Sequence, residues 1–112
     1  MRIAIPLADE KLAVHFGHCA SFALVDVNPA ERIILKREDI VAPPHQPGLL
    51  PPWLAERGVN LVIAGGMGQR ALALLADQGI TTVLGAPPET PESLVAAYLA
   101  GSMQTGENAC DH

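Results

Sequence analysis

The chain has 112 residues, which is enough for one compact domain and too few for two of ordinary size. Hydrophobic residues make up 49% of it, so we expect a packed core rather than disorder. The formal net charge is -5 at pH 7, and the seven Lys and Arg residues form no long basic run that could neutralise phosphates or an anionic membrane. We therefore expect neither nucleic acid nor a membrane as a partner.

The longest apolar runs of the chain are far too short to span a bilayer. Met1–Pro6 has the pattern of a strand and lacks the cleavage region of a signal peptide. The two cysteines, Cys19 and Cys110, lie far apart and form no CxxC pair, so we expect free thiols. These features predict a cytoplasmic protein, and we expect it to be a monomer.

Short strands are expected in the first 40 residues. Residues 2–6 predict a strand, whereas residues 7–17 show no sustained period and are expected to form a loop. Residues 21–27 and 32–40 predict two further strands, and Asn28-Pro29-Ala30-Glu31 between them has the composition of a turn. These two strands should form an antiparallel hairpin.

Five prolines interrupt residues 41–52, so we expect a long exposed connection there. A first helix should end near Arg57, because Gly58 can terminate it. After this helix the pattern predicts a strand over residues 60–64, a helix over 69–78, a strand over 80–84 and a helix over 91–100. Thr90 is the expected N-cap of the last helix, and Gly101 is its expected C-cap.

Three early strands followed by alternating helices and strands predict an α/β fold with a mixed five-stranded sheet. When the five predicted strands are numbered along the chain, the expected order in the sheet is 3-2-1-4-5, with helices on both faces. Residues 1–101 should form this single domain, and residues 102–112 should form a flexible polar tail.

The first candidate site is the run His15-Phe16-Gly17-His18-Cys19 between the first two strands. Imidazoles and a thiol suit soft or borderline metals, and the glycine allows a turn that would bring His15 and His18 together. His15, His18 and Cys19 are therefore candidate metal ligands. In the alternative interpretation, Phe16 anchors the loop in the core and both histidines are solvated.

The second candidate site is Gly65-Gly66-Met67-Gly68, which follows the most apolar strand and precedes a helix. Ligands bind at this position in open α/β sheets, and backbone amides at a helix N-terminus favour an anion. Arg70 would add positive charge. Neither a phosphate-binding GxxxxGK[ST] motif nor a full GxGxxG motif is present, so a nucleotide- or phosphate-binding module and a tight turn without a ligand both remain alternatives.

Other residues carry weaker signals. His45 lies in the proline-rich connection and Cys110, Asp111 and His112 end the chain, and all of them belong to metal-ligating residue types. The motifs of serine hydrolases, zinc peptidases and kinases are absent, and no orienting partner for a Cys19–histidine pair is evident. We therefore do not expect an enzyme, and a thiol-dependent enzyme that uses Cys19 is kept as an alternative.

Two segments together resemble a known family. MRIAIPLADEKLAVHFGHCASFALVDV is similar to its opening strand, HFG segment and second strand, and LVIAGGMGQRALALLADQGITTVLGA is similar to its GGxG block. The resemblance covers residues 1–101 and is to the dinitrogenase iron-molybdenum cofactor biosynthesis proteins, which include NifX-like accessory domains and the orange protein. It implies a ribonuclease H-like three-layer fold without ribonuclease activity.

The resemblance also implies a cargo, namely an anionic metal–sulfur cluster that contains molybdenum with copper or iron. The chain would carry or scaffold this cluster, and cofactor-assembly or recipient proteins would be its partners. His15 matches the histidine that is a candidate cluster contact in the family, whereas Cys19 is not a family feature, and Met67 would form a soft wall or pack in the core. The expected cofactor-binding residues are His15, Phe16, Gly17, His18, Gly65, Gly66, Met67, Gly68 and Arg70.

Overall fold

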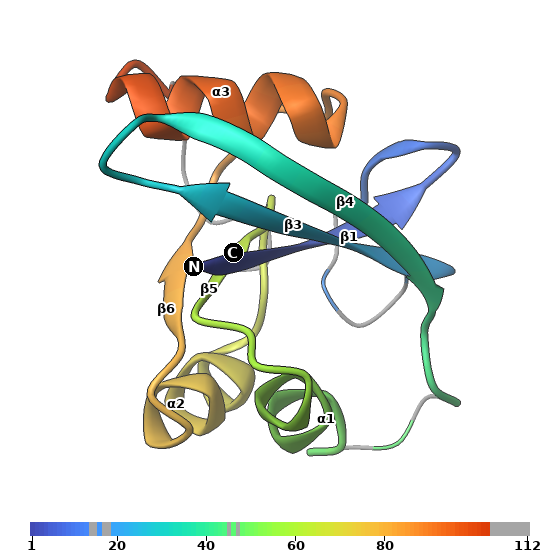
Figure 1. The fold of residues 1–112 in the computed structure, drawn as a ribbon. Coiled ribbons are helices and arrows are strands. Elements are labelled where there is room, and N and C mark those ends of the chain that lie inside the picture. Colours follow the sequence, from blue (N-terminus) through green and yellow to red (C-terminus); the bar gives the residue numbers. More distant parts are fainter. Residues whose placement is uncertain (14–15, 17–18, 45, 47, 104–112) are drawn as a thin grey trace.

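The computed structural model describes residues 1–13, 16, 19–44, 46 and 48–103, and it has three layers (Figure 1). A central mixed sheet is covered by α3 on one face and by α1 and α2 on the other. The strands are β1 (Arg2–Ala8), β2 (Lys11–Leu12), β3 (Ser21–Asn28), β4 (Ile33–Val41), β5 (Leu61–Ile63) and β6 (Thr81–Val83). The helices are α1 (Leu50–Glu56), α2 (Gln69–Asp77) and α3 (Pro91–Ala100).

The main path of the sheet has the order β4-β3-β1-β5-β6. β1, β5 and β6 are parallel, while β3 is antiparallel to both of its neighbours. The predicted order 3-2-1-4-5 is confirmed, because β4 is the third predicted strand and β6 is the fifth. The predicted three-layer α/β class is confirmed as well. No helix in the described part of the chain is long and apolar enough to cross a membrane.

The loop expected over residues 7–17 is wrong at its beginning. β1 continues through Ala8 and turns back into β2, with Leu7 opposite Leu12. The turn residues Asp9 and Glu10 have φ values of 53° and 67°, a region that residues with a Cβ rarely occupy. Asp-Glu is therefore an uncommon hairpin turn, which explains why the sequence pattern did not predict it.

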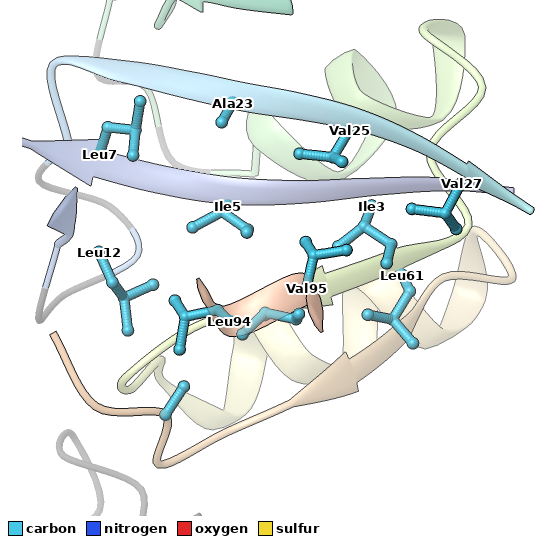
Figure 2. Close-up of a cluster of buried hydrophobic side chains, with 12 residues drawn as sticks. Ile3, Ile5, Leu7, Leu12, Ala23, Val25, Val27, Leu61, Leu94 and Val95 are labelled. Atoms are coloured by element: carbon cyan, nitrogen blue, oxygen red, sulfur yellow. The ribbon is translucent and has the colours of Figure 1, made fainter. Parts of the chain in front are cut away.

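The sheet separates two cores. We call the first the α3-side core; it contains Ile3, Ile5, Leu7, Leu12, Ala23, Val25, Val27, Leu61, Ile63, Ala86, Leu94 and Val95. Figure 2 shows Leu94 and Val95 of α3 facing the side chains of β1 and β3 across this core. We call the second the α1/α2-side core; it contains Ala4, Phe16, Phe22, Leu24, Leu54, Val59, Val62, Ala64, Met67, Leu75 and Ile80. The central strands β1, β3 and β5 are thus covered on both faces, as the apolar pattern of β5 predicts.

Local signals at the helix ends act as expected. Thr90 caps α3, and its hydroxyl accepts a hydrogen bond from the amide of Ser93 at 3.4 Å. Gly101 ends α3 with a φ of 74°, in the left-handed conformation that glycine adopts without steric cost. Pro51 lies in the first turn of α1, where its missing amide hydrogen costs nothing.

An ion pair joins β1, β3 and the end of α1. The Arg2 guanidinium donates to Asp26 Oδ1 at 2.8 Å and to the carbonyl oxygen of Arg57 at 2.7 Å. The hydrogen bond from Arg2 lowers the pKa of Asp26 below its usual value. Both side chains are partly shielded, with exposed fractions of 31% for Arg2 and 27% for Asp26, so the pair should contribute about 1 kcal/mol.

Replacing Asp26 with Asn should lower the free energy of unfolding by about 1 kcal/mol at pH 7. A carboxyl whose pKa is lowered in the folded state stabilises the fold fully above its unfolded pKa of about 3.9, and this contribution is lost as the pH falls through the folded pKa. The difference between the wild type and Asp26→Asn should therefore shrink in acid. Urea unfolding at pH 7 and in acid, below the folded pKa of Asp26, measures this difference in the free energy of unfolding. Glu31→Gln, a variant in the exposed turn, is the control. A constant difference would contradict the role of the pair.

Candidate functional site

Three loops meet at one edge of the sheet, because the carboxyl ends of the parallel strands β1, β5 and β6 all lie there. We call residues 13–20 the histidine loop, residues 65–68 the glycine loop and residues 84–90 the β6–α3 loop. The amide of Phe16 donates to the carbonyl oxygen of Gly66 at 3.1 Å, and the amide of Gly85 donates to the carbonyl oxygen of Gly65 at 3.0 Å. These bonds place the glycine loop between the other two.

The glycine loop leads directly into α2. Gly65, Gly66 and Met67 are buried, and Gly68 is exposed at the N-cap position with extended φ and ψ of -71° and 161°. A glycine offers no side-chain oxygen to the first amides of the helix, and these amides have no partner within the helix itself. No acidic residue lies in the first turn. The N-terminus of α2 therefore presents donors and a positive dipole end.

Space and charge at the loop also suit an anion. Apart from Gly68 itself and its chain neighbours Met67 and Gln69, no described heavy atom lies within 4 Å of the position where a Cβ on Gly68 would lie, so the space at the start of α2 is open. Arg70 is exposed in the first turn of α2, two residues after the glycine loop. An anion above Gly68 would meet amide donors and a nearby guanidinium.

The histidine and glycine loops each insert one side chain into the same core. Phe16 is 4% exposed and Met67 is 2% exposed, and both belong to the α1/α2-side core. The Phe16 ring meets Phe22 edge-on at a centroid distance of 5.9 Å, and Phe22 meets Trp53 at 5.6 Å. This packing anchors the loops. The structure therefore agrees with the interpretation in which Phe16 anchors its loop and Met67 packs in the core. A direct contact of either side chain with a cluster stays a prediction.

Cys19 lies at the end of the histidine loop and is partly buried against the α1/α2-side core. Its thiol donates to the carbonyl oxygen of Phe16 at 3.5 Å. Burial raises the pKa of Cys19 to about 11. The thiol is therefore protonated at neutral pH, whereas the thiolate is the form that attacks electrophiles or ligates metals.

Several predicted residues lie outside the described part of the chain, namely His15, Gly17, His18, His45, Cys110, Asp111 and His112. The flexible tail predicted for residues 102–112 falls there as well from residue 104 onward. Within the described residues, no group of three or more His, Cys, Asp or Glu side chains is close enough to hold a metal ion. The assignment of His15, His18 and Cys19 as metal ligands therefore stays a prediction.

The β6–α3 loop is a part of this edge that sequence reasoning missed. Its Glu89 carbonyl oxygen accepts a hydrogen bond from the amide of Leu12 at 3.0 Å, which attaches β2 to the start of α3. The amide of Ala86 donates to the carbonyl oxygen of Ala64 at 3.2 Å. The position of this loop at the carboxyl end of a parallel strand was the available signal, since such loops line ligand sites.

Comparison with known proteins agrees with this geometry. The model of the dinitrogenase iron-molybdenum cofactor family matches residues 1–101. The chain belongs to this family. The match includes both the histidine loop and the glycine loop, so the resemblance noted from the sequence is confirmed. The family connects the chain with metal–sulfur cofactors and the proteins that handle them.

Relatives match this family member over nearly their whole length, and the solved structures among them share its fold. An uncharacterized protein of Methanocaldococcus jannaschii is 26% identical over 96% of this chain and 92% of its own length. The crystal structure of PH0822 has a TM-score of 0.90 and 25% identity, with all of both chains covered. The apo form of the orange protein from Desulfovibrio gigas has a TM-score of 0.74 and 24% identity over 96% of this chain and 93% of that one. The last likeness shows the fold.

Alkylation should be slow at Cys19. In a Cys110→Ser background, iodoacetamide should modify Cys19 more slowly at pH 7.5 than it modifies an unfolded peptide of the same local sequence, because burial limits access and raises the pKa. Unfolding the protein in urea should restore the peptide rate. Mass spectrometry measures both rates. A folded-state rate above that of the peptide would favour the alternative of a thiol-dependent enzyme.

Proposed function

We propose that this protein binds an anionic metal–sulfur cluster, with molybdenum and either copper or iron, at the edge where the three loops meet. It acts as a carrier or assembly scaffold rather than as an enzyme, and it exchanges the cluster with assembly or recipient proteins. His15, His18 and the amides of the glycine loop are the proposed contacts, with Arg70 adding charge. The family of the chain supports the class of cargo.

The hydrogen bond from Phe16 to Gly66 carries this proposal. It holds the backbone of Phe16, the sequence neighbour of His15, against the loop that opens α2. Imidazole ligands and an anion-binding helix end would thereby face one ligand. A histidine-containing loop alone can be a solvated loop, and a glycine loop alone can be a tight turn. The combination of the two at the carboxyl edge of the sheet is typical of a binding site.

The charge balance supports local recognition. A chain with a net charge of -5 repels a polyanion at long range, so binding has to rely on short-range donors. Backbone amides at a helix N-terminus supply such donors and need no counter-charge elsewhere. Cluster sulfides and oxides can accept hydrogen bonds from these amides, and the imidazoles of His15 and His18 and the thiol of Cys19 are the proposed metal ligands.

Two substitutions at one position separate charge from helix capping. Gly68→Asp and Gly68→Asn both place an N-cap side chain in the open space over α2, and both should keep or slightly raise thermal stability. Only the aspartate adds a negative charge beside the anion. Its retention of a cluster made from tetrathiomolybdate and Cu(I) should fall by roughly tenfold or more relative to Gly68→Asn.

Anaerobic titration measures this retention through the absorption of the complex and the quenching of Trp53, the one tryptophan of the chain. Trp53 contacts Phe22, which contacts Phe16, so its emission is sensitive to the site. Equal retention by both variants would remove the glycine loop from the site. ATP and inorganic phosphate, titrated in parallel, distinguish the alternative of a phosphate-binding module, which would bind them and not the thiomolybdate complex.

His15 has its own test. His15→Ala should weaken retention of the tetrathiomolybdate–Cu(I) complex, because it removes an imidazole that can ligate copper or donate to a sulfide. The matched variant His45→Ala removes a histidine from the proline-rich connection and should leave retention unchanged. Equilibrium dialysis with metal analysis gives both affinities. Unchanged binding in His15→Ala would exclude His15 from the site and leave the glycine loop as the proposed contact.

A further inference from the structure

β4 is the last strand at one end of the sheet, and within the described residues no other strand covers its outer edge. Its side chains are mostly exposed. Leu35 and Val41 have exposed fractions of 61% and 81%, the highest among the large hydrophobic residues described as exposed. Apolar side chains at an open strand edge form a surface that another strand can cover.

From Leu35 to Val41, the residues of β4 alternate between the two faces of the sheet. Arg37 is opposite Val25 and Asp39 is opposite Ala23, and both of these partners belong to the α3-side core. Directly opposite residues share a face, and alternate residues along a strand do as well. Arg37, Asp39 and Val41 therefore form one row on the α3 side, and alternation from Lys36, which is opposite Asp26, places Leu35 on the same side. Leu35 itself has no partner on β3, because the register shifts at a β-bulge, and Ile34 beyond the bulge is opposite Val27 on this side as well.

The apolar and charged side chains of this row are complementary to those of an identical strand that runs antiparallel to it. If two β4 strands pair antiparallel around Glu38, Leu35 lies opposite Val41 of the second copy and Arg37 lies opposite Asp39 of the second copy. The twofold axis of such a pair is perpendicular to the sheet, so both α3-side faces stay on the same side. The two contacts each occur twice, once from either chain.

We propose that a second copy of this chain pairs with β4 in this register and continues the sheet into a symmetric dimer. Pairing covers Leu35 and Val41 and places opposite charges across from each other on the α3 side. Charged residues and a bulge often protect an edge strand from pairing. In β4 the order of the charges instead favours one partner, the same strand in antiparallel orientation.

The opposite face limits the strength of the dimer. Glu38 lies opposite Glu38 of the second copy at the axis, and this like-charge pair is unfavourable. Lys36 Nζ, which lies 3.9 Å from Glu38 Oε2 within each chain, offsets part of the repulsion.

The neighbouring register, centred on Arg37, is less favourable. It would place Arg37 opposite Arg37 of the second copy and Leu35 opposite Asp39 of the second copy. The ion pairs of Arg37 with Asp39 and Glu92 hold the guanidinium in place within each chain. We infer a weak, reversible dimer, which differs from the monomer expected from the sequence.

Mixing two charge-reversed variants tests the register. Asp39→Arg places arginine across from Arg37 in its own dimer, and Arg37→Asp places aspartate across from Asp39. Each variant alone should be a monomer, while an equimolar mixture should form a heterodimer in which both pairs between positions 37 and 39 are again opposite in charge. Sedimentation velocity over a concentration series up to about 0.5 mM measures this for the full-length chain.

Two further variants control the experiment. Val41→Lys should weaken the wild-type dimer at least tenfold, while Ile33→Lys changes an exposed apolar residue outside the paired segment and should leave it unchanged. Glu38→Gln should strengthen it severalfold, because the repulsion at the axis is removed. Circular dichroism checks that each variant is folded. A wild-type chain that is monomeric throughout, or a mixture that does not associate, would overturn the proposal.

Discussion

The parallel alignment of β1, β5 and β6 is the constraint on which the site depends. It brings the histidine loop, the glycine loop and the β6–α3 loop to one edge of the sheet, although the three loops are far apart in the sequence. The hydrogen bond from Phe16 to Gly66 then fixes the histidine loop beside the glycine loop. Without the parallel pairing, Phe16 and the glycine loop would not lie together at this edge.

Side chains from this edge of the sheet pack into both cores. Phe16 and Met67 anchor their loops in the α1/α2-side core, and Leu12 anchors the β1–β2 hairpin in the α3-side core. The apolar parts of the loops are thereby buried, and the exposed surface retains Gly68, the first amides of α2 and Arg70. In the proposed site, binding would rely on backbone donors that the packing holds in place, so a ligand would meet a largely formed site.

Local signals made most of the fold predictable. Thr90, Gly101 and the continuous apolar run of β5 specify helix ends and a buried strand through short-range chemistry, and short right-handed connections limit the possible strand orders. β2 was missed because its turn uses Asp and Glu at positive φ. The burial of Cys19 and the contribution of the β6–α3 loop depend on contacts between distant residues, which no local pattern carries.

Amide chemical shifts test the location of the site most directly. In an isotope-labelled sample, addition of the tetrathiomolybdate–Cu(I) complex should shift the amide signals of Phe16, of residues 65–71 and of residues 84–90. The signals of residues 28–33, at the opposite end of the sheet, should not move. Shifts confined to the opposite end, or none at saturating complex, would contradict a cluster site at the carboxyl edge.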